Sequence, residues 1–193
     1  ILVRAQQTAE ALAKGFVPRL DNAPLPHPLH ASLSEDILSD ADVTYLVLPA
    51  SASIEALAMI AAKAPAHCPV ILCAKGFIED KDKGGLFLTD YMSQAYPERP
   101  FALLSGPSFA DEILKGLPAA LVAASDDSAV ADNVIADFAP SHLRLYKGHD
   151  PIGVAIGGAV KNVIALAAGI SSGLGLGDNA KAALITRGLS ETA

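Results

Sequence analysis

The sequence has no tryptophan, two cysteines and few charged residues, and each scarcity excludes a class of protein. Cys68 and Cys73 have neither the spacing of a zinc site nor that of a disulfide framework, so we expect free thiols in a reducing compartment. The five histidines also lack metal-ligand spacing, so we expect no metal site. Only 18% of the residues are charged, and the net charge of -7 argues against a nucleic-acid-binding surface.

Hydrophobic residues dominate the composition. They make up 51% of the 193 residues, which is typical of a compact globular protein without a disordered tail. The run from Ile152 to Leu174 comes nearest to a membrane span, but Lys161 and several glycines interrupt it, so we expect no transmembrane helix and a cytoplasmic protein. The first residue is not methionine and the last lies in an expected helix, so we also expect the working protein to be longer.

Strand and helix patterns alternate through residues 1–148. Continuous apolar runs predict buried strands at 1–3, 43–48, 70–74, 101–104, 119–124 and 143–146. Helical patterns cover 6–14, 34–38, 50–63, 86–95, 109–115 and 129–138. The proline-rich stretch 16–33 predicts a loop, and Asp82 with its neighbours predicts an exposed turn. Short connections favour right-handed crossovers, so the expected fold class is α/β, a Rossmann-like, mostly parallel sheet with helices on both faces.

The pattern changes after Gly148, where helices replace strands. Asp150 can cap a helix whose first residue is Pro151. We therefore expect two domains, an α/β domain at 1–149 and the beginning of an all-helical domain at 150–193. The glycine-rich string 169–177 follows a helix rather than a strand, so it lacks the context of a phosphate-binding loop and predicts a helix-breaking joint.

Residues that follow the expected strands are the first candidates for a ligand site. In open parallel sheets, ligands bind outside the carboxyl ends of the strands. Gly76 and Gly106 lie there and allow the backbone to approach a ligand closely. Ser108 precedes an expected helix, so its hydroxyl and the free N–H groups of that helix suit a phosphate, although a simple N-cap is the plainer explanation. Lys75 is either a ligand contact or a solvated loop lysine.

One lysine stands alone in the long apolar run 151–176. Lysine is rarely fully buried unless it is paired or functional, and partial burial of Lys161 would lower its pKa and make it a usable acid or base. Asn162 adds a donor and an acceptor beside it. The alternative is a lysine whose ammonium reaches the surface of a small-residue helix. Arg4 is either a surface arginine or a partner for an adenosine 2′-phosphate.

Four ordered strings in the chain resemble the bacterial NAD(P)-dependent glycerol-3-phosphate dehydrogenases. They are Ala74-Lys75-Gly76, residues 104–112, residues 157–165 and residues 179–188. The resemblance covers essentially the whole chain and implies a dinucleotide-binding domain at 1–149 followed by a helical substrate domain. It also implies an enzyme that interconverts sn-glycerol 3-phosphate and dihydroxyacetone phosphate with NADH or NADPH. Such an enzyme feeds glycerophospholipid synthesis, and a homodimer stays open as its assembly.

The same resemblance implies roles on the substrate side. Lys161 resembles the family's proton acceptor, which also contacts the substrate, and Asn162 belongs to the same polar cluster. Lys75 resembles a residue that contacts both cofactor and substrate. Gly106 and Ser108 resemble substrate contacts. Two lysines in one cleft would suppress each other's charge, which helps one of them to act near neutral pH.

On the cofactor side, the resemblance implies contacts from two further residues. Arg4 resembles the arginine near the adenosine ribose and its 2′-phosphate, and Ala110 resembles a cofactor contact. The family's first strand with its glycine-rich turn, and its later phosphate-gripping motif, have no counterpart in residues 1–193. We therefore expect weak cofactor binding and no turnover from these residues alone.

Two other functions stay open from the sequence. A 3-hydroxyacid or 6-phosphogluconate-type dehydrogenase of the same architecture also uses a lysine and an asparagine on the long helix after the sheet. The string Ser105-Gly106-Pro107-Ser108 with Lys75-Gly76 favours the glycerol phosphate enzyme. A ligand-binding fragment without catalysis is the alternative from another class.

Overall fold

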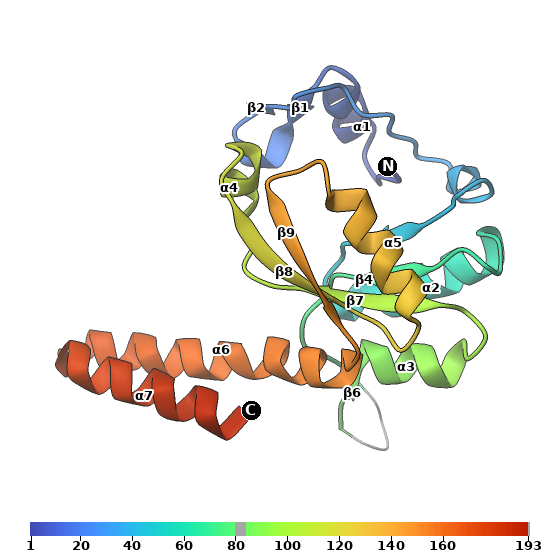
Figure 1. The fold of residues 1–193 in the computed structure, drawn as a ribbon. Helices are drawn as coiled ribbons and strands as arrows, with labels where there is room; N and C mark the ends of the chain where they lie inside the picture. Colours follow the sequence, from blue (N-terminus) through green and yellow to red (C-terminus); the bar gives the residue numbers. More distant parts are fainter. Residues whose placement is uncertain (80–83, 193) are drawn as a thin grey trace.

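The computed structural model describes residues 1–79 and 84–192, and the turn expected at Asp82 lies outside these ranges. The central sheet has the strand order β3-β4-β7-β8-β9 (Figure 1). Its strands are β3 (Thr44–Leu46), β4 (Val70–Leu72), β7 (Phe101–Ser105), β8 (Ala119–Ala124) and β9 (Leu143–Gly148). Neighbouring strands run parallel, except that β7 and β8 are antiparallel. The prediction of a mostly parallel α/β sheet is confirmed.

The antiparallel pair has a local cause at the end of β7. The chain passes from β7 through α4 (Ala110–Leu114) and returns as β8, with Ser105 paired to Val122. A parallel connection needs a crossover that carries the chain back along the sheet, usually with a full helix. Because α4 has only five residues, the chain returns beside β7 in the opposite direction.

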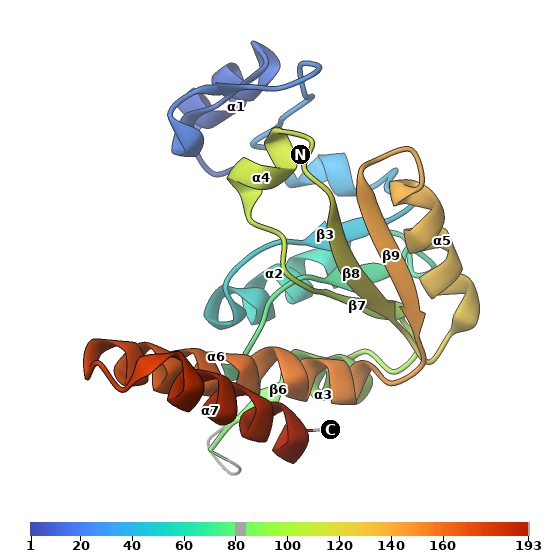
Figure 2. The ribbon, with the colours of Figure 1, turned by 60° about the vertical axis from the view of Figure 1, so that its left-hand side comes forward.

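Helices cover both faces of the sheet because its central strands are apolar at successive positions. Val70 and Leu72 of β4 belong to the core on one face, and Ile71 belongs to the core on the other. This alternation follows from the period of two residues in a strand. The helices are α2 (Ala50–Lys63) and α3 (Leu88–Ala95) on the first face and α5 (Ser128–Phe138) on the second (Figure 2).

The N-terminal segment forms small elements at one end of the sheet (Figure 1). They are α1 (Gln6–Ala13), β1 (Phe16–Val17), η1 (Pro18–Leu20), β2 (Ala23–Pro24) and η2 (Glu35–Leu38). The prediction of a buried strand at 1–3 is wrong, because Leu2 makes only an isolated bridge to Ser32 and Ile1 is 54% exposed. Among the described residues, no strand pairs with residues 1–3 beyond this single bridge. The expected loop at 16–33 contains a small hairpin, in which β1 and β2 have two residues each.

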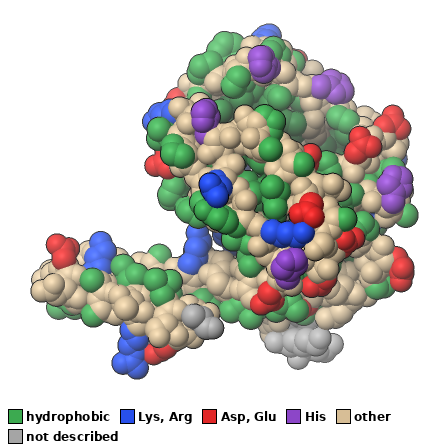
Figure 3. All heavy atoms as spheres, viewed as in Figure 1, with side chains coloured by type: hydrophobic (Ala, Val, Ile, Leu, Met, Phe, Trp, Pro, Cys, Tyr) green, Lys and Arg blue, Asp and Glu red, His purple; other side chains and the backbone are tan. Residues whose placement is uncertain are grey.

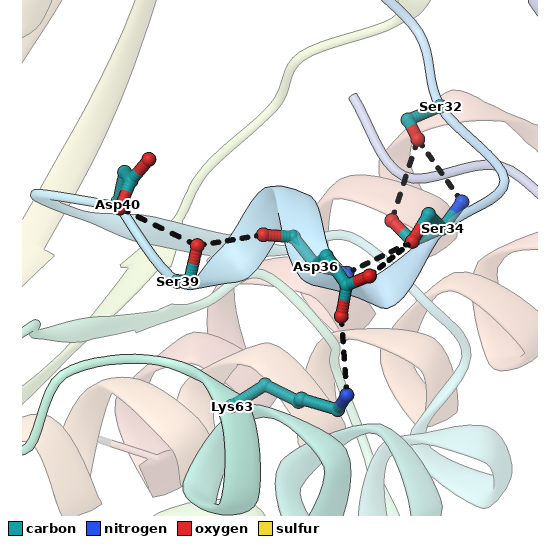
Figure 4. A network of polar contacts seen from close by, with 6 residues as sticks. All are labelled: Ser32, Ser34, Asp36, Ser39, Asp40 and Lys63. Carbon is teal, nitrogen blue, oxygen red and sulfur yellow. Dashed lines mark hydrogen bonds and ion pairs between the residues drawn. The ribbon is translucent and has the colours of Figure 1, made fainter.

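Ser34 caps η2, as the sequence predicts. Its Oγ accepts a hydrogen bond from the backbone N–H of Asp36 at 3.2 Å and donates one to Asp36 Oδ2 at 3.0 Å. Lys63 Nζ donates to Asp36 Oδ1 at 3.2 Å (Figure 4), and this hydrogen bond lowers the pKa of Asp36. Because both partners are exposed, the ion pair orients η2 against α2 more than it stabilises the fold.

A second hairpin precedes α3. Phe77 and Ile78 form β5, which pairs antiparallel with β6 at Leu86 and Phe87, and the rings of Phe77 and Phe87 lie 4.4 Å apart. The helix expected at 86–95 therefore begins two residues later, at Leu88. Because β6 immediately precedes the helix and is itself apolar, its pattern merges with the helical pattern.

Two long helices complete the described chain. Asp150 caps α6 (Pro151–Gly173) as predicted, because its Oδ1 accepts a hydrogen bond from the backbone N–H of Gly153 at 2.7 Å. The joint expected in 169–177 lies at 174–176, and α7 (Gly177–Thr192) then returns along α6. The first turns of α6 pack on the sheet domain through Val154 and Ala155, whereas the rest of this hairpin projects away from it (Figures 1 and 2).

The outer part of α6 is apolar and exposed. Val163, Leu166 and Ile170 are each more than 60% exposed, and apolar side chains extend along the projecting helices (Figure 3). The glycines expected to interrupt this run leave the helix continuous. By length and composition alone, α6 could cross a membrane, a test that the core helix of a water-soluble protein also passes.

Candidate functional site

A cleft of about 300 Å³ lies where α6 passes the carboxyl ends of β4 and β7. Parallel strands bring the segments that follow them to one edge of the sheet, which is where open α/β sheets bind ligands. The lining residues are Lys75, Ser105, Gly106, Pro107, Val122, Val154, Gly157, Gly158 and Lys161. Basic side chains face the angle between the projecting helices and the sheet domain (Figure 3). The sequence-predicted residues Lys75, Gly106 and Lys161 thus share one cleft.

Gly106 is required by the close approach of two strands. Its φ is +151°, and a Cβ there would lie 2.7 Å from the carbonyl oxygen of Ala120 and 2.8 Å from Leu121 Cα. Both neighbours are backbone atoms of β8, so they cannot move aside without disturbing the sheet. Gly106 therefore lies between β8 and the cleft, directly after the end of β7.

The two lysines differ from the expectation that Lys161 is partly buried. Lys161 is exposed, although α7 packs along α6. The lowered pKa belongs to Lys75, where partial burial is the main cause and the positive charge of Lys161 the second. Lys75 also keeps much of its side chain exposed, so solvent screens part of this effect. The positive charge of Lys161 thus disfavours the charged form of Lys75, as expected for two lysines in one cleft.

Cys73 lies at the end of β4, close to this site. Burial raises the pKa of its thiol to about 11, although the charge of Lys75 acts in the opposite direction. A thiol with such a pKa is protonated at neutral pH and is a poor nucleophile. Among residues 1–79 and 84–192, no group of three His, Cys, Asp or Glu side chains could hold a metal ion.

Ser108 and Ala110 lie just past Gly106, outside the lining of the cleft. The N-cap of α4 is Phe109, without a side-chain hydrogen bond, so the prediction of a Ser108 N-cap is wrong. The Ser108 hydroxyl donates instead to the carbonyl oxygen of Gly106 at 3.5 Å, and the side chain is exposed. The backbone is still extended at Phe109, so the helix begins one residue later than expected, at Ala110.

Arg4 and Asn162 are also outside the lining of the cleft. Arg4 is exposed and precedes α1 in the N-terminal segment. Asn162 is exposed and follows Lys161 on α6, where one residue corresponds to a rotation of about 100° around the helix axis. Lys161 and Asn162 therefore point in different directions from the same turn.

Two small residues that belong to strings noted in the sequence, but were given no role there, shape the cleft. A Cβ on Gly158 would lie 3.5 Å from Ser105 Oγ and 3.8 Å from Lys75 Cγ, so α6 approaches both strand ends closely here. Ser105 itself lines the cleft as the last residue of β7. The available signal was the Gly157-Gly158 pair, since glycine inside a helix costs about 1 kcal/mol relative to alanine and usually marks a close approach.

The architecture and the cleft together define a Rossmann-like protein with a cleft at the carboxyl edge of its strands that two lysines line. The chain belongs to the NAD-dependent glycerol-3-phosphate dehydrogenase family. The model of the family's N-terminus matches residues 4–131, and the model of its C-terminus matches residues 150–193. The family resemblance seen in the sequence is thereby confirmed.

Curated relatives agree with this assignment. The chain is 42% identical over 195 residues to glycerol-3-phosphate dehydrogenase (NAD(P)+) of Mesorhizobium japonicum, covering 99% of this chain and 55% of that protein. It is 41% identical over 172 residues to the enzyme of the same name from Agrobacterium fabrum, covering 89% of this chain and 52% of that protein. The chain thus spans about half the length of the curated relatives it matches.

Solved structures give the same result. Glycerol-3-phosphate dehydrogenase from Coxiella burnetii superposes with a TM-score of 0.85 at 34% identity, over 98% of this chain and 58% of that chain. The Plasmodium falciparum glycerol-3-phosphate dehydrogenase superposes with a TM-score of 0.86 at 27% identity, over 96% of this chain and 52% of that chain. Both similarities include the sheet and the beginning of the helical part.

Proposed function

We propose that this chain is part of an enzyme that interconverts sn-glycerol 3-phosphate and dihydroxyacetone phosphate with NADH or NADPH. The observation that carries the proposal is the convergence of Lys75, Lys161 and Gly106 on one cleft at the carboxyl edge of the sheet. Two cationic side chains suit the phosphate of the substrate, and the cleft volume suits a small ligand. Family membership supports the same reaction and its place in glycerophospholipid synthesis.

The cleft can take the nicotinamide end of a dinucleotide, because it lies at the carboxyl edge of the strands and is open at Gly157, where no described atom lies within 4 Å of a built Cβ. A bound NADH or NADPH supplies the hydride. Lys161 donates a proton to the C2 oxygen of dihydroxyacetone phosphate during reduction and, as a neutral amine, accepts it from glycerol 3-phosphate in the reverse direction. Lys75 contacts both ligands from the opposite wall.

The remaining assignments are part of the same proposal. Gly106 and Ser108 contact the substrate, and Asn162 supports the polar cluster around Lys161. Arg4 and Ala110 contact the cofactor. We also propose two domains, at 1–149 and 150–193, since strands end with β9 and only helices follow.

We infer a cytoplasmic enzyme that does not insert into membranes or bind nucleic acid. The charge of Lys161 lies near the middle of α6, where insertion into a bilayer would be costly. The net charge of -7 opposes binding to nucleic acid, and Cys68 and Cys73 are free thiols, as expected in a reducing compartment. A homodimer is the proposed assembly. Cell fractionation tests the location, and recovery in the membrane fraction after carbonate washing would contradict it.

The decisive experiment measures NADPH and NADH oxidation by the protein in the length in which its own cell makes it, as established by intact mass. We expect the protein to oxidise NADPH or NADH with dihydroxyacetone phosphate and not with 3-oxoacids. Consumption with 3-oxoacids alone would identify the rival dehydrogenase of the same architecture. No consumption with either, by a folded protein, would leave a ligand-binding role.

A further inference from the structure

Thr89 has a buried hydroxyl group that the proposed reaction does not use. The residue is the second of α3 and is 2% exposed. Among the described residues, Thr89 Oγ1 finds no hydrogen-bond partner. A hydroxyl that loses its water without gaining a partner is destabilising, so such groups are rare in folded proteins. We therefore expect a small polar molecule to bind this hydroxyl.

Thr89 lines a small cavity. It measures about 10 Å³, which is close to the space that one water molecule needs. Leu88 and Thr89 of α3 line it together with Lys75 and Ser105, which follow or end strands of the central sheet. α3 begins here without a side-chain cap, so backbone N–H groups of its first turn add donors to the same region.

The small cavity adjoins the substrate cleft. Lys75, Ser105, Val154 and Gly158 line both of them. A water molecule is stable inside a protein when it has two to four polar partners. Thr89, Ser105 and Lys75 all line the cavity, and their side chains together with nearby backbone groups offer that number of polar partners. A group bound there touches the same residues that the substrate meets on the other side.

We propose that Thr89 is a positioning residue that holds a buried water in this cavity, and that this water links α3 to Ser105 and Lys75. The water fixes the turn after β4, so that the Lys75 side chain projects into the cleft. This role rests on the proposed function, since Lys75 is there a contact for substrate and cofactor. The charged and titratable groups that influence Lys75 are Lys161 of α6 and Cys73, which follows β4.

Two substitutions separate the hydroxyl from the shape of the side chain. Thr89→Val keeps the shape and removes the hydroxyl, whereas Thr89→Ser keeps the hydroxyl and removes the methyl group. If Thr89 only fills space, Thr89→Val resembles the wild type and Thr89→Ser is the weaker protein. If the hydroxyl holds a water, Thr89→Ser resembles the wild type and Thr89→Val is the weaker protein. The comparison thus distinguishes a positioning role from a packing role.

Thermal unfolding tests the bound water without any activity measurement. We expect the Thr89→Val protein to melt below the wild type and Thr89→Ser to melt close to it, because the valine leaves the water short of a partner. A Thr89→Val protein that melts above the wild type would show an unpaired hydroxyl and overturn the proposal. A high-resolution crystal structure with no water density beside Thr89 would overturn it as well.

Kinetics with dihydroxyacetone phosphate then test the positioning role. We expect Thr89→Val to lower kcat/KM about tenfold, the loss that corresponds to one hydrogen bond, mainly through a raised KM, and Thr89→Ser to retain it. An unchanged kcat/KM in Thr89→Val overturns the role. Ser171→Ala is the matched control, because Ser171 Oγ is also buried without a partner among the described residues but lies outside the cleft, and we expect wild-type kinetics.

The two proposals fail in different ways. A wild-type protein without activity on dihydroxyacetone phosphate contradicts the proposed function, and the unfolding comparison and the crystal structure still decide whether the water is bound. Activity in the wild type together with a more stable Thr89→Val protein contradicts only the water site.

Discussion

Gly188 of α7 lies directly against Ile164 of α6, so that a Cβ on Gly188 would stand 2.9 Å from Ile164 Cγ1. The two helices can approach this closely only because one of them has no side chain at the contact. An alanine there gains about 1 kcal/mol of helix propensity and loses a similar amount by overlap with a movable isoleucine. The two effects nearly cancel.

A larger side chain at Gly188 is expected to separate the helices. Gly188→Leu should destabilise the α6–α7 hairpin by about 1–3 kcal/mol, the usual cost of overpacking. Amide hydrogen exchange of α7 measures this loss. Gly169→Leu is the control, because nothing lies within 4 Å of a Cβ on Gly169. Equal protection in both variants would contradict the close packing at Gly188.

Gly106→Ala is expected to destabilise the sheet domain strongly. The new methyl group would meet backbone atoms of Ala120 and Leu121 in a conformation that favours glycine. We expect a loss of about 2–4 kcal/mol, which combines backbone strain with a clash that no side-chain rotation relieves. Urea unfolding measures the loss, and Gly76→Ala separates the two terms, since its φ is also positive but the space around it is open.

Gly157 offers a way to block the cleft without harming the fold. It lines the cleft, and nothing lies within 4 Å of a Cβ built on it. Gly157→Leu should therefore raise the KM for dihydroxyacetone phosphate at least about tenfold by occupying ligand space, while helix propensity slightly favours the fold. Gly169→Leu on the same helix should keep the KM of the wild type. A normal KM in Gly157→Leu would place the substrate elsewhere.

Lys161→Ala is expected to abolish most of the turnover and leave the sheet domain folded. Removing a general acid–base group costs about 10²–10⁴-fold in rate. Because Lys161 is exposed, its loss should change the melting temperature little. Single-turnover kinetics and circular dichroism check the two statements. Normal turnover in this variant would return Lys161 to the class of surface lysines.

The pKa of Lys75 should be visible in its reactivity. Partial burial and the charge of Lys161 lower this pKa below the ordinary value of 10.5, so Lys75 carries more neutral amine than it would in the unfolded chain. Competitive acetylation below pH 10.5 should label Lys75 faster than in the denatured protein. In Lys161→Ala the pKa should rise and the labelling slow, whereas an unchanged rate would contradict the coupling of the two lysines.

The same shift sets the direction of a stability change with pH. The folded protein binds fewer protons at Lys75 than the unfolded protein between the lowered pKa and 10.5. The charged lysine therefore opposes folding at lower pH, and this cost disappears as the pH rises through that window. Lys75→Met should therefore show a smaller rise in the free energy of unfolding between the lowered pKa and pH 10.5, as measured by urea unfolding at several pH values.

Much of the sheet was predictable because its strands are buried on both faces. Residues 70–72 are fully buried, and only a continuous apolar run satisfies that environment. The position of Lys75 and Gly106 at one edge followed from the rule that parallel strands end together. The short strand β6 was not predictable, since two apolar residues ahead of a helix carry no period of their own.

The candidate site was predictable only in part. Lys161 was singled out by the contrast between its charge and its apolar neighbours, but its exposure depends on which side of α6 faces its neighbouring elements in the folded chain. Thr89 gave no signal, because one threonine near a helix start is ordinary and its burial depends on three elements that are distant in sequence. Contacts of this kind exist only after the chain has folded.

The place where α6 touches the sheet domain has a mechanical consequence. α6 approaches Ser105 and Lys75 closely at Gly158 and projects away from the sheet domain farther along (Figure 1), so a bend of the helix is expected to pivot near Gly158. At about 1.5 Å per residue, Lys161 lies about 4.5 Å beyond this pivot and Gly173 about 22 Å. A bend of about 10° would move the far end by about 4 Å and Lys161 by less than about 1 Å. The lysine is thus sheltered from movements of the helix that carries it.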